Sequence, residues 1–132
     1  MAKFDNQKCL IADDYSTARR LIKDSLQQIG FSCLEAENGN QAIALIQQTT
    51  LDLVIADVNM PEKNGLEILK EIRADDNMKD LPVVLTMIEP FDDLISEAMK
   101  LGMNDFIVKP FDVFTLSKTL DKVIKTTGGE SL

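Results

Sequence analysis

The sequence contains no histidine and only two cysteines among its 132 residues. Histidine and cysteine are the usual protein ligands of zinc and of most transition metals, so their scarcity excludes the common sites for those metals. Cys9 and Cys33 each stand in a short apolar run, where a free cysteine behaves as a small buried hydrophobic residue. We therefore expect neither a zinc site nor a structural disulfide.

Long hydrophobic runs are also missing. No apolar segment approaches the roughly 20 residues that a membrane-spanning helix needs. The opening residues, MAKFDNQK, lack the apolar segment of a secretory signal. The hydrophobic fraction of 45% is typical of a soluble globular protein. We expect a soluble cytoplasmic protein.

Positive charge is scarce. The chain has 14 lysines and arginines against 22 aspartates and glutamates, which gives a net charge of −8. Such an excess opposes binding to nucleic-acid phosphates or to an anionic membrane surface. We expect protein or cation partners, and neither nucleic acid nor membrane.

Five short apolar runs alternate with longer amphipathic segments. The runs have strand length and cover residues 8–12, 32–36, 51–56, 82–87 and 105–109. The segments after them carry apolar residues three and four positions apart, as helices with one buried face do. Ser16 is expected to cap the first helix, and Gly30 to follow its last residue.

This alternation predicts a doubly wound α/β fold, in which helices cover both faces of a five-stranded parallel sheet. The sequence has no internal repeat, linker or change of composition that would divide it. We expect one domain over residues 1–132, with a core at about 7–125 and a flexible polar tail at 126–132.

Ligands of doubly wound sheets bind at the carboxyl ends of the strands. Asp13 and Asp14 follow the first predicted strand, Asp57 follows the third, and Met87 and Lys109 end the fourth and fifth. A single aspartate in such a position is most often a turn former or a helix cap. Several acids and a lysine at the same edge of one sheet, however, indicate a functional site.

Three carboxylates would meet in one small volume if the first and third strands were neighbours. Two like charges about 4 Å apart repel by roughly 4 kcal/mol at an effective dielectric constant of about 20. Either one acid is protonated or a cation is bound, and carboxylate oxygens with water are the usual ligands of Mg²⁺. A carboxylate beside Mg²⁺ and the Lys109 ammonium could form an aspartyl phosphate.

Motifs across nearly the whole chain resemble the receiver domain of two-component response regulators, and within it the stand-alone chemotaxis regulators of the CheY type. They are ADDYSTARR, EAENG, ADVNMPEKNGLEILKEIRAD, LPVV and GMNDFIVKPF. The resemblance implies the strand order 2-1-3-4-5, for which such proteins are the known example. That order makes the first and third strands neighbours.

The resemblance also implies roles for the acids. Asp57 would accept a phosphoryl group from a phosphohistidine of a partner kinase. Because this chain has no histidine of its own, a separate kinase or a small phosphodonor is required. Asp14, Asp57 and the backbone carbonyl of Asn59 would bind Mg²⁺ directly, and Asp13 would act through water.

Other positions follow from the same resemblance. Lys109 would contact the phosphoryl group, and its peptide bond to Pro110 would be cis. Val58, Ile88, Glu89 and Pro110 would be further neighbours of the phosphoryl group. Phe106 would be either a ring that changes rotamer on activation or simply a core residue.

The chain departs from the family pattern at the end of the fourth strand. A gapless reading places Met87 where the family has a switch serine or threonine, and Ile88 where it has a small residue. Sliding Thr86 into the switch position would turn every side chain of the strand to the opposite face, which disfavours that reading. Methionine cannot donate a hydrogen bond to a phosphoryl oxygen, and Ile88 would crowd the entrance to the site.

We expect a monomeric signalling protein rather than an enzyme in the usual sense. Phosphorylation of Asp57 would change the affinity of the face formed by the fourth helix, fifth strand and fifth helix for a target protein. The alternative is a module that binds its partner whether or not Asp57 is phosphorylated, because Met87 replaces the switch hydroxyl.

Overall fold

Ten elements alternate along the chain in a computed structural model, which describes residues 4–124. They are β1 (Lys8–Ala12), α1 (Ser16–Gln28), β2 (Ser32–Ala36), α2 (Gly39–Gln48), β3 (Leu53–Asp57), α3 (Gly65–Ala74), β4 (Val83–Met87), α4 (Asp92–Leu101), β5 (Asp105–Val108) and α5 (Val113–Val123). The tail predicted at 126–132 lies outside the described residues. None of the helices described in residues 4–124 has the length and apolar character to cross a membrane.

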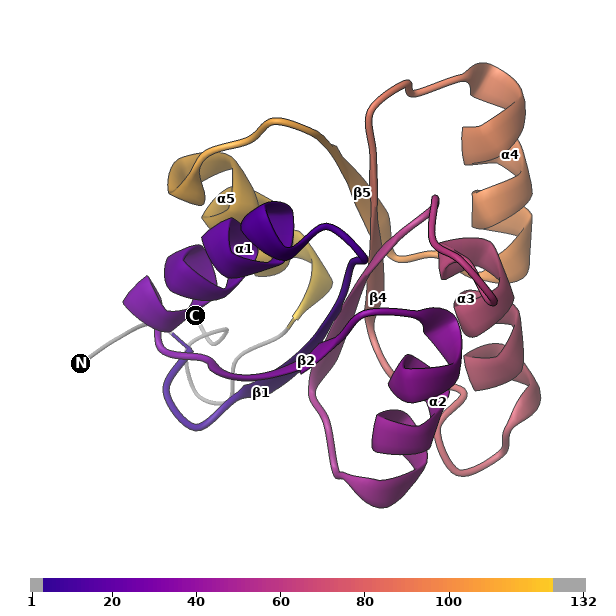
Figure 1. The fold of residues 1–132 in the computed structure, drawn as a ribbon, viewed down its shortest axis with the longest axis horizontal. Helices are drawn as coiled ribbons and strands as arrows, with labels where there is room; N and C mark the ends of the chain where they lie inside the picture. The colour runs from indigo at the N-terminus through magenta and orange to yellow at the C-terminus, as the bar shows by residue number, and fades with distance from the viewer. Residues whose placement is uncertain (1–3, 125–132) are drawn as a thin grey trace.

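The five strands form one parallel sheet in the order β2-β1-β3-β4-β5, which confirms the predicted fold and strand order. Figure 1 shows α1 and α5 on one face of the sheet and α2, α3 and α4 on the other. The edge strands are β2 and β5. The three inner strands are covered on both faces, which explains their nearly continuous apolar sequences.

Alternate residues of each strand enter two separate apolar layers. Ile11 packs in the layer beneath α1 and α5, hereafter the α1–α5 layer, whereas Leu10 packs in the layer beneath α2, α3 and α4, hereafter the α2–α4 layer. Phe4, which precedes the expected start of the core at residue 7, is 1% exposed, and its ring centroid lies 5.1 Å from that of Phe31. The two-residue period thus decides which helices each strand residue meets.

Strand boundaries differ from the sequence prediction by one or two residues. The third strand begins at Leu53 rather than at residue 51, and the side chain of Asp52, just before it, accepts a hydrogen bond from the Lys8 backbone N–H of β1. The fourth begins at Val83, after Pro82, which has no N–H to donate. The fifth ends at Val108, although the Lys109 N–H still donates to the Met87 carbonyl.

The predicted cap of the first helix is wrong. Ser16 is the first helical residue, and Tyr15 occupies the cap position without a side-chain hydrogen bond. The Tyr15 N–H instead donates to Oδ1 of Asp13 at 2.9 Å, so the preceding aspartate organises the turn. Gly30 follows the helix as predicted and has a φ of +110°, which favours glycine.

Arg73, near the end of α3, joins three segments at the amino edge of β4. Its guanidinium donates to the backbone carbonyls of Lys79, Leu81 and Gly102 and to the Asn104 side chain, at 2.7–3.1 Å. Burial lowers the pKa of Arg73 from its ordinary value. Gly102 ends α4 with a φ of +100°, and a Cβ there would lie 2.9 Å from Nε of the arginine.

Replacing this guanidinium should destabilise the fold. Arg73→Met keeps much of the aliphatic stem but leaves the carbonyls without their donor, so we expect the free energy of unfolding to fall by about 2–4 kcal/mol. Urea denaturation followed by circular dichroism measures the change. Lys70→Met, at an exposed position of the same helix, is the control, and a loss no larger than in that control would contradict this role.

Candidate functional site

An acidic cluster with one ammonium group occupies the carboxyl edge of the sheet. Asp13 follows β1, Asp57 ends β3, and Lys109 follows β5. The Lys109 Nζ lies 2.7 Å from Oδ2 of Asp13 and 3.1 Å from Oδ2 of Asp57. Together with the exposed Asp14, the two aspartates each offer an oxygen within 4.8 Å of the others. The structure thus brings together the three carboxylates and the lysine that the sequence pointed to.

Strand register explains this convergence. Ala12 pairs with Ala56 across β1 and β3, so the next residues, Asp13 and Asp57, occupy neighbouring positions at the sheet edge. Asp13 is 0% exposed and Asp57 is 8% exposed. Three carboxylates face one ammonium, so the cluster has a surplus of negative charge in a poorly solvated place. A divalent cation would remove that surplus.

Burial and charge act differently on the two titrating partners. Burial raises the pKa of Asp57, although the Asn59 N–H bonded to its Oδ1 at 3.1 Å and the Lys109 ammonium oppose the rise. Burial alone would lower the pKa of Lys109, but its hydrogen bonds to Asp13 and Asp57 outweigh that effect and raise its pKa. The lysine therefore stays charged at neutral pH.

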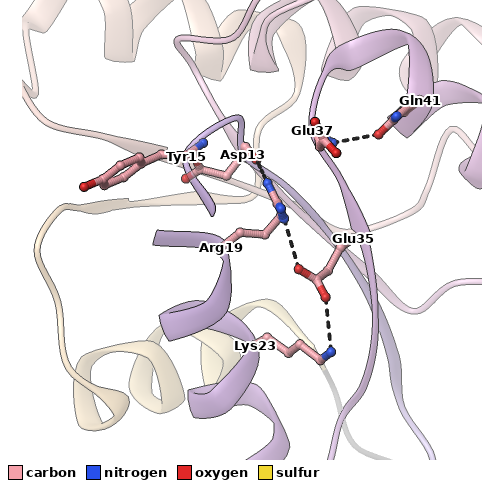
Figure 2. Close-up of polar contacts among 7 residues, drawn as sticks. All are labelled: Asp13, Tyr15, Arg19, Lys23, Glu35, Glu37 and Gln41. Carbon is pink, nitrogen blue, oxygen red and sulfur yellow. Dashed lines mark hydrogen bonds and ion pairs between the residues drawn. The ribbon is translucent and has the colours of Figure 1, made fainter. Parts of the chain in front are cut away.

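The backbone of Asp13 is held by a network that the sequence analysis missed. Figure 2 shows Arg19 of α1 between the Asp13 backbone and Glu35 of β2. Its Nη1 donates to the Asp13 carbonyl at 2.7 Å, and its Nε donates to Glu35 at 3.0 Å. Lys23 also contacts Glu35, and the two cations lower the pKa of that carboxyl. The only signal was that Arg19 and Glu35 lie in the motifs ADDYSTARR and EAENG.

The predicted metal ligand Asn59 lies beside the acids. It lines an open pocket of about 300 Å³ together with Asp14 and Val58. A larger hollow of about 1080 Å³ lies at the opposite, amino edge of the sheet, with Asp52, Leu81 and Pro82 in its wall. We assign function to the acidic cluster beside the smaller pocket, because there one ammonium, that of Lys109, contacts two buried carboxylates.

The last residues of β4 face opposite sides of the sheet. Met87 is fully buried in the α2–α4 layer. Because side chains alternate along a strand, the side chain of Thr86 points to the opposite face, which α1 and α5 cover. Ile88 and Glu89 follow the strand and are exposed, with Ile88 at 64%. Phe106, half-buried on β5, packs against the α2–α4 layer. The ring therefore lies on the same face as Met87.

The peptide bond between Lys109 and Pro110 is cis, as the sequence resemblance implied. Both cysteines are free, which confirms the expectation of no disulfide. Cys9 and Cys33 are register partners on β1 and β2. Burial raises the pKa of both thiols, that of Cys33 to about 11. Neither is a reactive thiolate at neutral pH.

Comparisons with known proteins agree with this geometry. Residues 9–121 match the family model described as the response regulator receiver domain. The chain is 42% identical over 121 residues to chemotaxis protein CheY-3 of Vibrio cholerae, covering 91% of this chain and 93% of that protein. The match extends over almost the full length of both.

Solved structures resemble the fold closely. Chemotaxis protein CheY4 of Vibrio cholerae superposes with a TM-score of 0.85 at 33% identity, over 89% of this chain and 98% of that one. The receiver domain of a Pseudomonas aeruginosa sensor histidine kinase, which has magnesium in its active-site cleft, superposes with a TM-score of 0.81 over 89% and 96% of the two chains. At 24% identity, this second structure shows likeness of fold alone.

Removing the charge of Asp57 should stabilise the free protein. Because burial raises the pKa of this carboxyl, its ionised form costs folding free energy at neutral pH. We expect Asp57→Asn to raise the free energy of unfolding at pH 7 by about 1 kcal/mol without divalent cations. The gain should shrink as pH falls through the folded pKa and disappear below the ordinary carboxyl pKa of 3.8.

Urea denaturation between pH 3 and 8 tests this dependence. Asp24→Asn, which removes an exposed carboxylate from α1, is the control for the change in net charge. A variant at position 57 that is less stable than the parent at pH 7 would show that attraction to Lys109 outweighs the burial of the charge.

Proposed function

Because the chain belongs to the response regulator receiver family, we propose that Asp57 is its phosphoryl acceptor and that its modification controls binding of a target protein. The chain is a receiver domain of the CheY type and not a conventional enzyme. Its relatives are chemotaxis proteins, so the proposal includes a role in chemotaxis signalling. The observation that carries it is the pair of contacts from the Lys109 ammonium to Asp13 and Asp57.

The transfer uses a donor phosphohistidine on a partner kinase. A carboxylate oxygen of Asp57 forms a bond to phosphorus while the bond from phosphorus to the imidazole nitrogen breaks. The electron pair of that bond stays with the nitrogen, which takes up a proton. Lys109, already charged beside Asp57, moves one of its hydrogen bonds to a phosphoryl oxygen and stabilises the developing charge.

The donor set fits a divalent cation. Asp14, Asp57 and the Asn59 backbone carbonyl would hold Mg²⁺ directly, and Asp13 would hold it through water. The ion would neutralise the phosphoryl oxygens during transfer. Val58, Ile88, Glu89 and Pro110 are proposed as the further neighbours of the phosphoryl group.

A target surface is proposed on α4, β5 and α5. Three exposed apolar side chains support it, one from each element: Met99, Val108 and Phe114. The Lys118 Nζ lies 5.5 Å from the centre of the Phe114 ring, so this part of the surface combines an aromatic ring with a cation. Phe106 on β5 is the proposed link from the phosphorylation site to this surface.

One observation favours a second function. Met87, at the switch position of the gapless reading, is fully buried among apolar side chains and cannot donate a hydrogen bond to a phosphoryl oxygen. A receiver without that contact could bind its partner whether or not Asp57 is modified. The two functions differ in how far the effect of phosphorylation spreads.

Beryllofluoride, a phosphoryl analogue, tests the proposal. With Mg²⁺ present, we expect amide shifts in NMR spectra at Asp57 and Lys109 and also along Phe106 and α4, because the lysine must move toward the analogue. Asp57→Asn should abolish the beryllofluoride shifts. Shifts confined to the acidic cluster would favour the second function, and their absence in the parent protein would overturn the assignment of Asp57.

Ile88 should limit access to Asp57. Its side chain is 64% exposed at the end of β4, two residues beyond the Thr86 position that pairs with Asp57. We expect Ile88→Ala to raise the rate of phosphorylation by acetyl phosphate by about threefold or more, since it opens the approach to the carboxylate. The rate is measured from the growth of an NMR signal of the phosphorylated form after acetyl phosphate is added to wild type and variant.

Leu21→Ala, at a similarly exposed position of α1, is the control for loss of exposed apolar surface. An unchanged rate in the Ile88 variant would mean that this side chain leaves the entrance open.

A further inference from the structure

Thr86 carries the one buried side-chain polar atom that lacks a hydrogen-bond partner within residues 4–124. The residue is 1% exposed, and its hydroxyl oxygen makes no hydrogen bond there. Such a group costs free energy, because it has lost its water and gained nothing in return. An unpartnered hydroxyl next to a reacting carboxylate therefore needs an explanation.

Strand register places this hydroxyl beside the acidic cluster. Thr86 pairs with Asp57 on one side and with Ile107 on the other. Ile107 belongs to the α1–α5 layer, and paired residues of parallel strands point to the same face. The side chains of Thr86 and Asp57 therefore project from neighbouring strands, about 5 Å apart, on that face.

The path of Lys109 brings it over the same place. The lysine starts beyond β5, yet its Nζ reaches Asp57 on β3 and Asp13 after β1. The strand between is β4, so the side chain must cross β4 near the carboxyl end that carries Thr86 and Met87. Thr86 thus belongs to the strand that the lysine crosses to hold Oδ2 of Asp57 in the unphosphorylated state.

We propose that Thr86 is a positioning residue whose hydroxyl donates a hydrogen bond to Oδ2 of Asp57 once Lys109 turns to the phosphoryl group. This inference rests on the proposed role of Asp57 as acceptor. In the acyl phosphate, the unesterified carboxyl oxygen of Asp57 is a carbonyl that has lost its ammonium partner, and its second lone pair can accept a hydrogen bond beside the cation. A donor at the neighbouring strand position satisfies it.

The energetic consequence is a preference between two states. In the free protein the hydroxyl is unpartnered, and in the phosphorylated protein it is bonded, so the same group raises the free energy of one state and lowers that of the other. Met87 supplies no such contact on the opposite face of the sheet. The hydroxyl that stabilises the phosphorylated state therefore lies on the face of the sheet covered by α1 and α5, and not on the face covered by α4.

Two substitutions separate this role from simple packing. Thr86→Val keeps the shape and removes the hydroxyl, and Thr86→Ser keeps the hydroxyl. For Thr86→Val we expect an unfolding free energy equal to or above that of the parent without ligands, because an unsatisfied group is gone. We also expect its affinity for beryllofluoride, measured by NMR titration at saturating Mg²⁺, to fall by about fivefold.

Thr86→Ser should keep the affinity for beryllofluoride close to that of the parent, and Mg²⁺ alone should bind all three proteins equally. Thr119→Val, which changes a buried threonine of α5, is the matched control. An unchanged affinity in Thr86→Val, or a marked loss of stability in its free form, would overturn the inference. Absence of beryllofluoride binding in the parent would instead overturn the role of Asp57.

Discussion

The Lys109 ammonium shared between Asp13 and Asp57 is the interaction on which the site depends. It is the one positive charge in contact with these two carboxylates in the described part of the chain, and both are largely withdrawn from water. Burial acts against the charges of Asp57 and Lys109, yet the lysine remains ionised because the acids stabilise it. One cation cannot balance three acids, and this imbalance makes the place suitable for a divalent ion and then for a phosphoryl group.

The two-residue period of the strands connects this chemistry to the rest of the fold. Asp57 and Thr86 project to the face covered by α1 and α5, whereas Met87 and Phe106 project to the face covered by the other helices. Side chains at neighbouring positions of one strand thus point to opposite faces of the sheet. Arg19 ties the loop that carries Asp13 to α1 and, through Glu35, to the sheet edge. The loop that carries Asp13 is therefore supported from the face of the sheet that α1 and α5 cover.

Sequence alone was enough to predict the fold, because the apolar runs have the length of strands and the segments between them have apolar residues at helical spacing. The convergence of Asp13, Asp14 and Asp57 required one more fact, that β1 and β3 are neighbours, which came from family resemblance. Arg73 was missed because its acceptors are backbone carbonyls, which have no signature in a sequence. The cap at Ser16 was wrong because the Asp13 carboxylate, two residues before Tyr15, takes over the hydrogen bond that defines the turn.

The distance along the chain between the charged groups has a consequence for synthesis. Lys109 is separated from Asp13 by 96 positions and from Asp57 by 52. A nascent chain emerging from the ribosome can pair its first four strands while the acids still have no counterion from the fifth. Docking of β5 then brings Lys109 to the acids and relieves their repulsion, so this contact stabilises the addition of the last strand to the sheet.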